Sequence, residues 1–369
     1  MNQPTPSGPP CGRIARRTFL ADVGMGFTGL ALGSMLQGDR LAAEQASARW
    51  APPDGKPHFT PKAKSVIWVF LSGGVSQMET WDPKPALTKY ANKSFNDTPF
   101  PDPLKSPLFK QRSRDVVGGE RPYPKIYPMQ VGFKKHGKAG VEITDWWPHL
   151  AGCVDDIAFV RSMYCTDNDH GAEFQMHTGR HVLDEKQPVI GSWVHYGLGS
   201  LNENLPQFVF LGQYKDTRVR YNFDADYPGP RHSGIELSLD PAQPLPFAKP
   251  GKGISAEEQK QLFELAGEMN KLAAVRYPDD PHVRARIASY ELAFRMQMAV
   301  PGVLDLTRET AQTHKLYGID NPNTAIYGRR LLTSRRLVQH GVRFVLCYLS
   351  DYGEWDSHNE LKNNHARSC

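Results

Sequence analysis

Short apolar runs rich in β-branched and aromatic residues recur along the chain and predict buried strands. We expect strands at Ser65–Leu71 (SVIWVFL), Ile157–Met163 (IAFVRSM), Gln207–Gly212 (QFVFLG) and residues 342–349 (VRFVLCYL). Runs without polar alternation are typical of strands that are buried on both faces of a parallel sheet. The Ser-Gly-Gly sequence at 72–74 predicts a tight turn after the first strand, because glycine adopts backbone conformations that other residues avoid.

Helical patterns fill the C-terminal half before the chain returns to a strand. Ser255 and Glu258 form a capping box that predicts the start of a long helix. We expect a second helix to end at Pro301, and a third, with its many arginines on a solvated face, to end at Gly341. A short helix is expected within residues 145–156. Strands that alternate with helices predict an α/β fold with a mainly parallel sheet and right-handed crossovers.

The first 48 residues predict a twin-arginine (Tat) export signal. Arg16 and Arg17 precede a mildly apolar stretch, Val23–Leu36, and the sequence Ala46–Ala48 is a plausible cleavage site. The apolar stretch is too short and too rich in glycine for a stable membrane span. The signal implies the Tat export machinery as a partner and a periplasmic or secreted location. The alternative is a chance arginine pair ahead of an N-terminal helix.

Composition indicates one large folded domain. The chain has 369 residues, of which 40% are hydrophobic, enough to bury a core. We interpret residues 49–61 as a linker, residues 62–369 as a single α/β domain, and the proline-rich residues 83–130 as a covering loop. The formal charge of +5 is weak and scattered, which argues against nucleic acid as a partner. The five cysteines form no CxxC pair, and we interpret them as buried thiols.

Polar clusters follow three of the predicted strands. SGGVSQMETWDPKP follows the first strand, CTDNDHGAEFQMHTGR the second and SDYGEWDSHN the last. Because the carboxyl ends of parallel strands lie on one edge of a sheet, and ligands bind there in open α/β folds, we expect these clusters to meet in one crevice.

Carboxylates and imidazoles in the first and last clusters predict a metal site. Glu79 and Asp82 are oxygen donors for a divalent cation, and Lys84 could neutralise an anionic ligand. Asp356 and His358 are a carboxylate and an imidazole two residues apart, which can converge on one ion. The alternative for this last pair is a solvated loop with a turn-forming aspartate.

The middle cluster predicts a helix of about three turns that begins near Asp169 or His170. Unpaired amides at its start would face the crevice and form an anion site. His177 and His181 are spaced to share a helix face and could chelate a metal, but without a third ligand nearby we favour a packing role. From this cluster we assign Asp169 and His170 to catalysis and Asn168 to substrate binding, and from the first cluster Lys84 to substrate binding as well.

Together, SGGVSQMETWDPKP, NDHGAEFQMHTGR and GEWDSHNELKNNHARSC behind a Tat signal resemble the bacterial domain-of-unknown-function 1501 family, often labelled sulfatase-like. The similarity covers about residues 60–369. That family is grouped with the alkaline phosphatase and sulfatase superfamily. The resemblance implies a doubly wound α/β fold of alkaline phosphatase-like type, one or two divalent metals, and a Ser, Thr or modified Cys nucleophile at a helix start.

Carried onto this chain, the superfamily pattern fits in part. Thr178 and Gly179 resemble the end of the nucleophile helix, and counting back ten residues reaches Asp169, where neither a hydroxyl nor a thiol stands. Asp169 could be a metal ligand, a carboxylate nucleophile or a relic, and Cys165 and Thr166 lie a few residues upstream. The WDSH sequence resembles the superfamily's later Asp and His metal ligands.

In related chains a further strand and a His-rich segment follow, so we expect this chain to be a fragment that lacks late strands and exposes apolar surface, which predicts poor solubility. The leading hypothesis is an exported hydrolase of sulfate or phosphate esters, on a small-molecule or glycan substrate, that depends on a divalent metal (Zn, Ca or Mg). The alternative is a non-catalytic exported protein that binds an anionic glycan or a partner.

Overall fold

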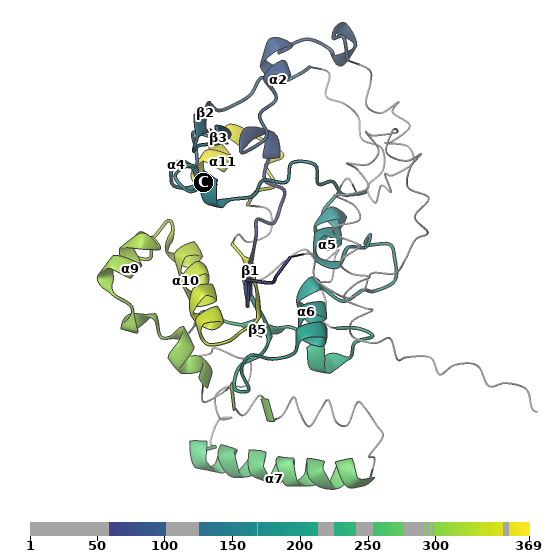
Figure 1. Ribbon diagram of the computed structural model, residues 1–369, viewed down its shortest axis with the longest axis vertical. Helices are drawn as coiled ribbons and strands as arrows, with labels where there is room; N and C mark the ends of the chain where they lie inside the picture. The colour runs from purple at the N-terminus through teal and green to yellow at the C-terminus, as the bar shows by residue number, and fades with distance from the viewer. Residues whose placement is uncertain are drawn as a thin grey trace, which may run out of the picture.

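A four-stranded parallel sheet forms the centre of the protein (Figure 1). The structure is a computed structural model that describes residues 59–100, 125–167, 169–212, 225–240, 254–276, 291–292, 295–296, 299–349 and 354–369. The strands lie in the order β1-β6-β4-β5 and have these bounds: β1 Val66–Phe70, β6 Phe344–Tyr348, β4 Phe208–Leu211 and β5 Ile235–Leu237. The described chain is therefore a mixed α/β fold, as predicted.

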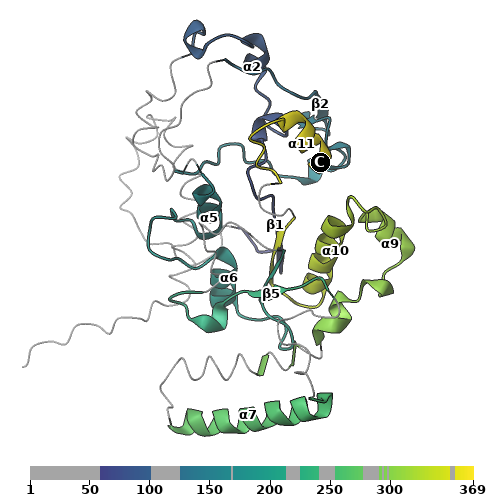
Figure 2. The ribbon, with the colours of Figure 1, turned by 180° about the vertical axis from the view of Figure 1, so that it is seen from behind.

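Helices cover both faces of this sheet, with α10 (Ala325–Gln339) on one side and α6 (Ile190–Leu198) on the other (Figures 1 and 2). Successive residues of β6 enter different cores, because side chains alternate across a strand. Val345 packs in the same cluster as Leu337 of α10, whereas Phe344 packs with Val194 of α6. Continuous apolar runs therefore form the central strands, since both of their faces are buried.

A smaller lobe stands beside the carboxyl end of β1 (Figures 1 and 2). An antiparallel ribbon of β2 (Phe133–His136) and β3 (Val141–Thr144) packs with α4 (Pro148–Ala151) around the buried Ile143. The C-terminal helix α11 (Leu361–Ser368) lies beside this ribbon. The remaining helices have these bounds: η1 Gln77–Glu79, α2 Pro85–Lys89, η2 Phe95–Asp97, η4 Val154–Asp156, α5 Gly171–Thr178, η5 Pro230–His232, α7 Ala256–Arg276, η6 Leu306–Arg308 and α9 Ala311–Leu316.

The predicted strand at Ile157–Met163 is wrong, because these residues form no strand in the structure. Phe159 packs on the small core around Ile143, whereas Val160 and Met163 are exposed. One residue of this apolar run, Phe159, therefore packs on the small core, and the run adds no strand to the sheet.

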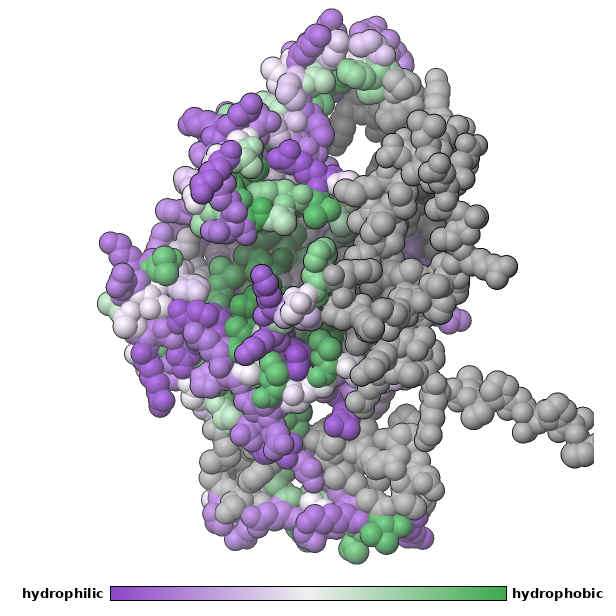
Figure 3. All heavy atoms as spheres, viewed as in Figure 1, coloured by the Kyte–Doolittle hydropathy of each residue, from purple (hydrophilic) through white to green (hydrophobic). Residues whose placement is uncertain are grey.

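The prediction that the first strand is buried on both faces is also wrong. β1 is an edge strand, and Val66, Ile67 and Val69 are 42%, 36% and 46% exposed. An apolar hollow is visible in the middle of one face of the molecule, beside β1 (Figure 3). The expected apolar surface is thus present on this strand, and poor solubility stays a prediction.

Three smaller predictions need correction. Helical residues continue through Pro301 to residue 304. On α10 the arginines do not all face solvent, since Arg330 is buried and donates to the backbone oxygens of Tyr348 and Leu349. Among the four described cysteines only Cys347 is buried.

The signal, most of the linker and much of the covering loop lie outside the described residues. No helix among the described residues has the length and hydropathy of a membrane span.

Candidate functional site

Four side chains form a continuous chain of contacts at the edge of the sheet. His170 Nδ1 lies 2.7 Å from Glu173 Oε1, and His170 Nε2 lies 3.2 Å from Asp356 Oδ2. The same Asp356 oxygen lies 2.9 Å from His358 Nε2. This relay, Glu173–His170–Asp356–His358, runs from a buried carboxylate to an imidazole whose side chain is 78% exposed.

The carboxyl end of β1 holds the relay in place. Gly73, in the turn after β1, donates its backbone N–H to Glu173 Oε1 at 3.1 Å. Its φ of 101° is one that glycine tolerates, and a Cβ at this position would lie 2.8 Å from the backbone nitrogen of Asp356. The turn, the start of α5 and the segment after β6 therefore meet. The rule for parallel sheets predicted this for the turn and the last segment, whereas no strand precedes α5 in residues 157–163.

His365 of α11 fastens the last segment to the first. Its Nε2 accepts the backbone N–H of Ser76 at 3.0 Å, and its Nδ1 lies 3.2 Å from the hydroxyl of Ser357. Burial lowers the pKa of His365, which keeps Nε2 free of a proton and able to accept. This histidine therefore positions the segment that carries Asp356 and His358.

Two carboxylates keep His170 protonated. Both ring nitrogens face carboxylate oxygens, so each must carry a proton to donate. The hydrogen bond to Glu173 is the main cause that raises the pKa of His170; burial opposes it, and the charges of Glu173, Asp356 and Asp169 add to it. With one imidazolium between Glu173 and Asp356, the relay carries a net charge of about −1.

Glu173 was missed by the sequence analysis. It is buried, it joins His170 to the turn after β1, and its second oxygen, Oε2, has no hydrogen-bond partner among the described residues. The available signal was its position three residues after His170 in the first turn of a helix, a spacing at which side chains meet.

The carboxylate of Asp167 lies beside the start of α5, where an anion site was predicted. The side chain of Asp167 is fully buried, accepts the backbone N–H of Asp169 at 3.1 Å and lies against Gly171, the first residue of the helix. A side chain at Gly171 would collide with this carboxylate. An acidic group near a helix N-terminus is favourable, but no side chain caps α5 with a hydrogen bond, and the anion site stays a prediction.

His181 stands behind Asp167. Its Nδ1 accepts the backbone N–H of Leu183 at 3.1 Å, so the proton of a neutral ring sits on Nε2, which lies 3.2 Å from Asp167 Oδ2. The side chain of His181 is 2% exposed. It lies beyond the end of α5, and its packing role agrees with the sequence-based interpretation.

The other predicted site residues have separate partners. Glu79 is buried and accepts the backbone N–H of Gln130, and burial raises its pKa while this hydrogen bond lowers it. Asp82 pairs with Lys84 at 2.7 Å. Asp169 adds its charge to the surroundings of His170. Asn168 lies outside the described residues.

The metal assignment stays a prediction. Within the described ranges no group of three or more His, Cys, Asp and Glu side chains is arranged to hold a metal ion, so Glu79 and Asp82 do not join Asp356 and His358 in one such group. The donor types of Asp356 and His358 nevertheless fit a divalent cation, because carboxylate and imidazole are common metal ligands.

His177 belongs to the core and makes stability depend on pH. Its ring lies 4.4 Å from that of Phe70, its Nε2 lies 3.3 Å from the hydroxyl of Tyr348, and burial lowers its pKa to about 3. Between pH 6.5 and about pH 3, His177 is protonated in the unfolded chain but neutral in the folded chain. The free energy of unfolding therefore falls as the pH is lowered through this range.

We expect this effect to reach on the order of 4 kcal/mol by pH 3. His177→Phe, which keeps an aromatic ring in the core, should flatten the pH dependence of urea unfolding between pH 6.5 and 3. The exposed His149→Gln is the control and should leave that dependence as in the natural chain. Equal slopes in His177→Phe and the natural chain would contradict the assignment.

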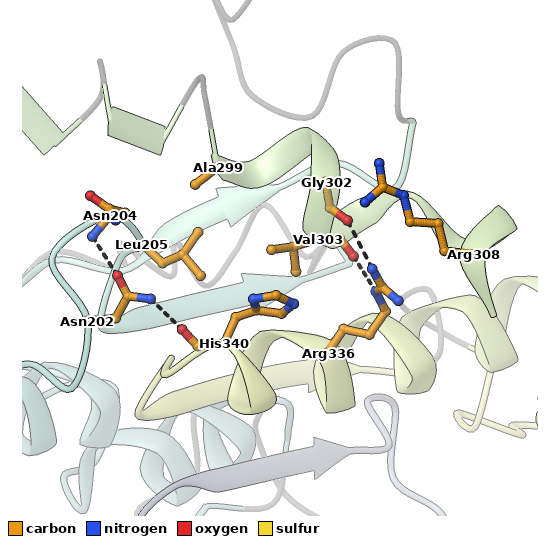
Figure 4. Close-up of a pocket in the computed structure, with 9 residues that line it drawn as sticks. All are labelled: Asn202, Asn204, Leu205, Ala299, Gly302, Val303, Arg308, Arg336 and His340. Carbon is orange, nitrogen blue, oxygen red and sulfur yellow. Dashed lines mark hydrogen bonds between the residues drawn. The ribbon is translucent and has the colours of Figure 1, made fainter.

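A cavity of about 360 Å³ lies at the opposite edge of the sheet, where α10 ends and β6 begins (Figure 4). The guanidinium of Arg336 is already engaged there, donating to the backbone oxygens of Val303 and Gly302 and to Glu309. This cavity is not the candidate site, because Glu309 neutralises the charge of Arg336 and no residue of the relay lines the cavity. Its lining residues are Asn202, Asn204, Leu205, Ala299, Gly302, Val303, Arg308, Arg336 and His340.

Comparison with known proteins agrees with the resemblance carried by the sequence motifs. No curated protein and no solved structure matches the chain. The family model described as "Protein of unknown function (DUF1501)" matches residues 63–369, the part that holds the sheet, the small lobe and the relay. The chain therefore belongs to the DUF1501 family.

Proposed function

We propose that the chain is an exported, metal-dependent hydrolase of sulfate or phosphate esters, with the relay as its active site. The observation that carries this proposal is the convergence of His170 and His358 on one oxygen of Asp356, at the sheet edge where α/β folds bind ligands. The alkaline phosphatase-like type of the fold, implied by the motifs, belongs to the same proposal.

The charge of the relay supports a cation. A sulfate or phosphate ester is an anion, and the relay meets it with a net negative charge. Lys84, which was predicted to bind the substrate anion, pairs with Asp82 instead. Asp356 and His358 would hold the cation, which could be Zn, Ca or Mg. When bound, it would polarise the ester oxygen and stabilise charge on the leaving group.

His170 is the general acid in this proposal. Its two hydrogen bonds are unequal, 2.7 Å to Glu173 and 3.2 Å to Asp356, and charge-assisted bonds are normally 2.7–2.9 Å long. The proton on Nε2 is therefore the loosely held one.

Water forms a new bond to sulfur or phosphorus, the ester bond breaks, and His170 Nε2 gives its proton to the leaving oxygen. The proton released by the water then restores the imidazolium.

Turnover tests the proposal directly. We expect the purified chain to release 4-nitrophenol from 4-nitrophenyl sulfate or 4-nitrophenyl phosphate, to lose this activity after treatment with a chelator, and to regain it when Zn²⁺, Ca²⁺ or Mg²⁺ is restored. Absence of turnover on both esters with every cation would overturn the hydrolase proposal. Turnover that survives the chelator would contradict the metal requirement but not the role of His170 as the general acid.

A second candidate is a non-catalytic exported protein that binds an anionic glycan or a partner. The missing nucleophile favours it, because Asp169 stands where the superfamily pattern has a hydroxyl or a thiol. Asp169→Ser separates the two candidates. An enzyme that uses this carboxylate should lose rate, whereas a binding protein should change only its affinity for a sulfated glycan in calorimetry.

Export through the Tat pathway rests on Arg16 and Arg17. We expect the double substitution Arg16→Lys and Arg17→Lys to stop export in a bacterium with an active Tat pathway, so that the unprocessed chain accumulates in the cytoplasm. Arg40→Lys, outside the pair, is the matched control and should be exported normally. Immunoblots of the cell fractions measure both, and undiminished export of the double variant would refute the signal.

A further inference from the structure

Helix α7 carries a stripe of large apolar side chains on its surface. Leu262, Leu265, Met269 and Leu272 are between 53% and 72% exposed, and the three core clusters of the described residues include no residue of this helix. Figures 1 and 2 show α7 lying across one end of the molecule, away from the sheet. Single exposed apolar residues are common, but an aligned row of them indicates an interaction surface.

The spacing of the stripe is that of a coiled-coil seam. The four residues follow one another at intervals of three, four and three, which keeps them on one face of a helix that winds around another helix. The helix is 21 residues long, so the seam lies on a rod of roughly 30 Å. A seam of this kind fits another helix better than it fits a flat surface.

The seam is symmetric about Gly267. Leu265 and Met269 lie two residues on either side of Gly267, and Leu262 and Leu272 lie five residues on either side. If a second copy of the helix lies antiparallel with a two-fold axis at Gly267, Leu262 meets the copy's Leu272 and Leu265 meets its Met269. Such self-complementarity is what a two-fold interface requires.

Charges at the two ends of the seam select the antiparallel arrangement. Continuing the spacing by four residues at each end reaches Glu258 in the first turn and Arg276 in the last turn. In an antiparallel pair each Glu258 faces the copy's Arg276, whereas in a parallel pair like charges face each other. The amino end of the helix is fixed by a capping box in which Ser255 and Glu258 exchange hydrogen bonds.

We propose that α7 is a dimerisation helix that pairs antiparallel with α7 of a second copy of this chain. The occupant is a second copy because the seam is complementary to itself, in its apolar residues and in its charges. The pairing is independent of the relay and of the proposed hydrolase activity.

The mass of the full chain in solution tests this pairing. By sedimentation equilibrium at rising concentration we expect a mass approaching twice the 41.4 kDa of the monomer. Leu265→Glu and Leu272→Glu should each shift the species to monomer at the same concentrations. Leu316→Glu on α9, which alters an 80% exposed leucine outside the seam, is the matched control and should remain dimeric. Circular dichroism shows whether each variant keeps its helices.

Charge exchange tests the direction of the helices. Arg276→Glu should weaken the dimer about tenfold, because it replaces two ion pairs with two like-charge pairs. Adding Glu258→Arg to it should restore the dimer. The rescue cannot come from helix stability, because Glu258→Arg removes half of the capping box. A parallel pair would show no rescue, which would overturn the arrangement.

Three outcomes overturn the proposal as a whole. They are a monomer at every concentration, a dimer that Leu265→Glu leaves intact, and a monomer that sediments with vesicles of anionic phospholipid, since the last would identify a membrane surface as the occupant of the seam.

Discussion

Replacing His170 with glutamine is expected to lower kcat on esters with poor leaving groups by about 10²–10⁴-fold. Glutamine keeps a polar side chain beside Glu173 and Asp356 but cannot protonate the leaving oxygen. An alkyl sulfate or phosphate needs that proton, whereas 4-nitrophenolate leaves well without it. The loss should therefore be much larger for the alkyl ester than for the nitrophenyl ester.

This difference between leaving groups shows whether His170 acts as the general acid or only maintains the structure of the site. A variant that merely disturbed the fold would lose rate equally on both esters. The exposed His149→Gln is the matched control and should change neither rate. Equal losses on the two esters in His170→Gln would show that the imidazole supports the site without acting as the acid.

Replacing His181 with alanine is expected to destabilise the fold by about 3–5 kcal/mol, because it leaves the charge of Asp167 buried without its imidazole. The contact of 3.2 Å between His181 Nε2 and Asp167 Oδ2 joins two side chains that are 2% and 0% exposed, so water cannot replace the lost partner. The free energy of unfolding from urea titration measures the effect.

A second substitution tests the cause of that loss. Adding Asp167→Asn to His181→Ala removes the buried charge and should recover part of the lost stability, whereas His149→Ala on the surface should cost less than about 0.5 kcal/mol. If the double variant is less stable than His181→Ala by the full cost of Asp167→Asn alone, the two side chains are not coupled and the explanation fails.

The central strands could be predicted because their uninterrupted apolar sequences indicate burial on both faces. β4 and β6 are buried on both faces and are apolar without interruption. β1 has the same composition, but it lies at the edge of the sheet, and the strand order that exposes it is not a local property. Residues 157–163 show the reverse case, since a comparable run covers the small lobe and never enters the sheet.

The meeting of the first and last polar clusters could also be predicted, because both follow strands of one parallel sheet. The middle cluster reaches the same edge although residues 157–163 ahead of it form no strand. The individual pairings could not be predicted. Glu173 meets Gly73 a hundred residues away, and His170 meets Asp356 at a separation of 186 residues. The position of Asp167 was foreseeable in part, because an acidic side chain near the start of a helix is favourable.

The central claim is that Glu173, His170, Asp356 and His358 act as one unit, and a double-mutant cycle on kcat tests it most directly. Glu173→Gln and Asp356→Asn should each lower kcat on an alkyl ester, and the chain that carries both should be scarcely slower than the worse single variant, because groups that act together are lost together. If the two losses instead multiply in the double variant, the carboxylates act independently and the relay is not a functional unit.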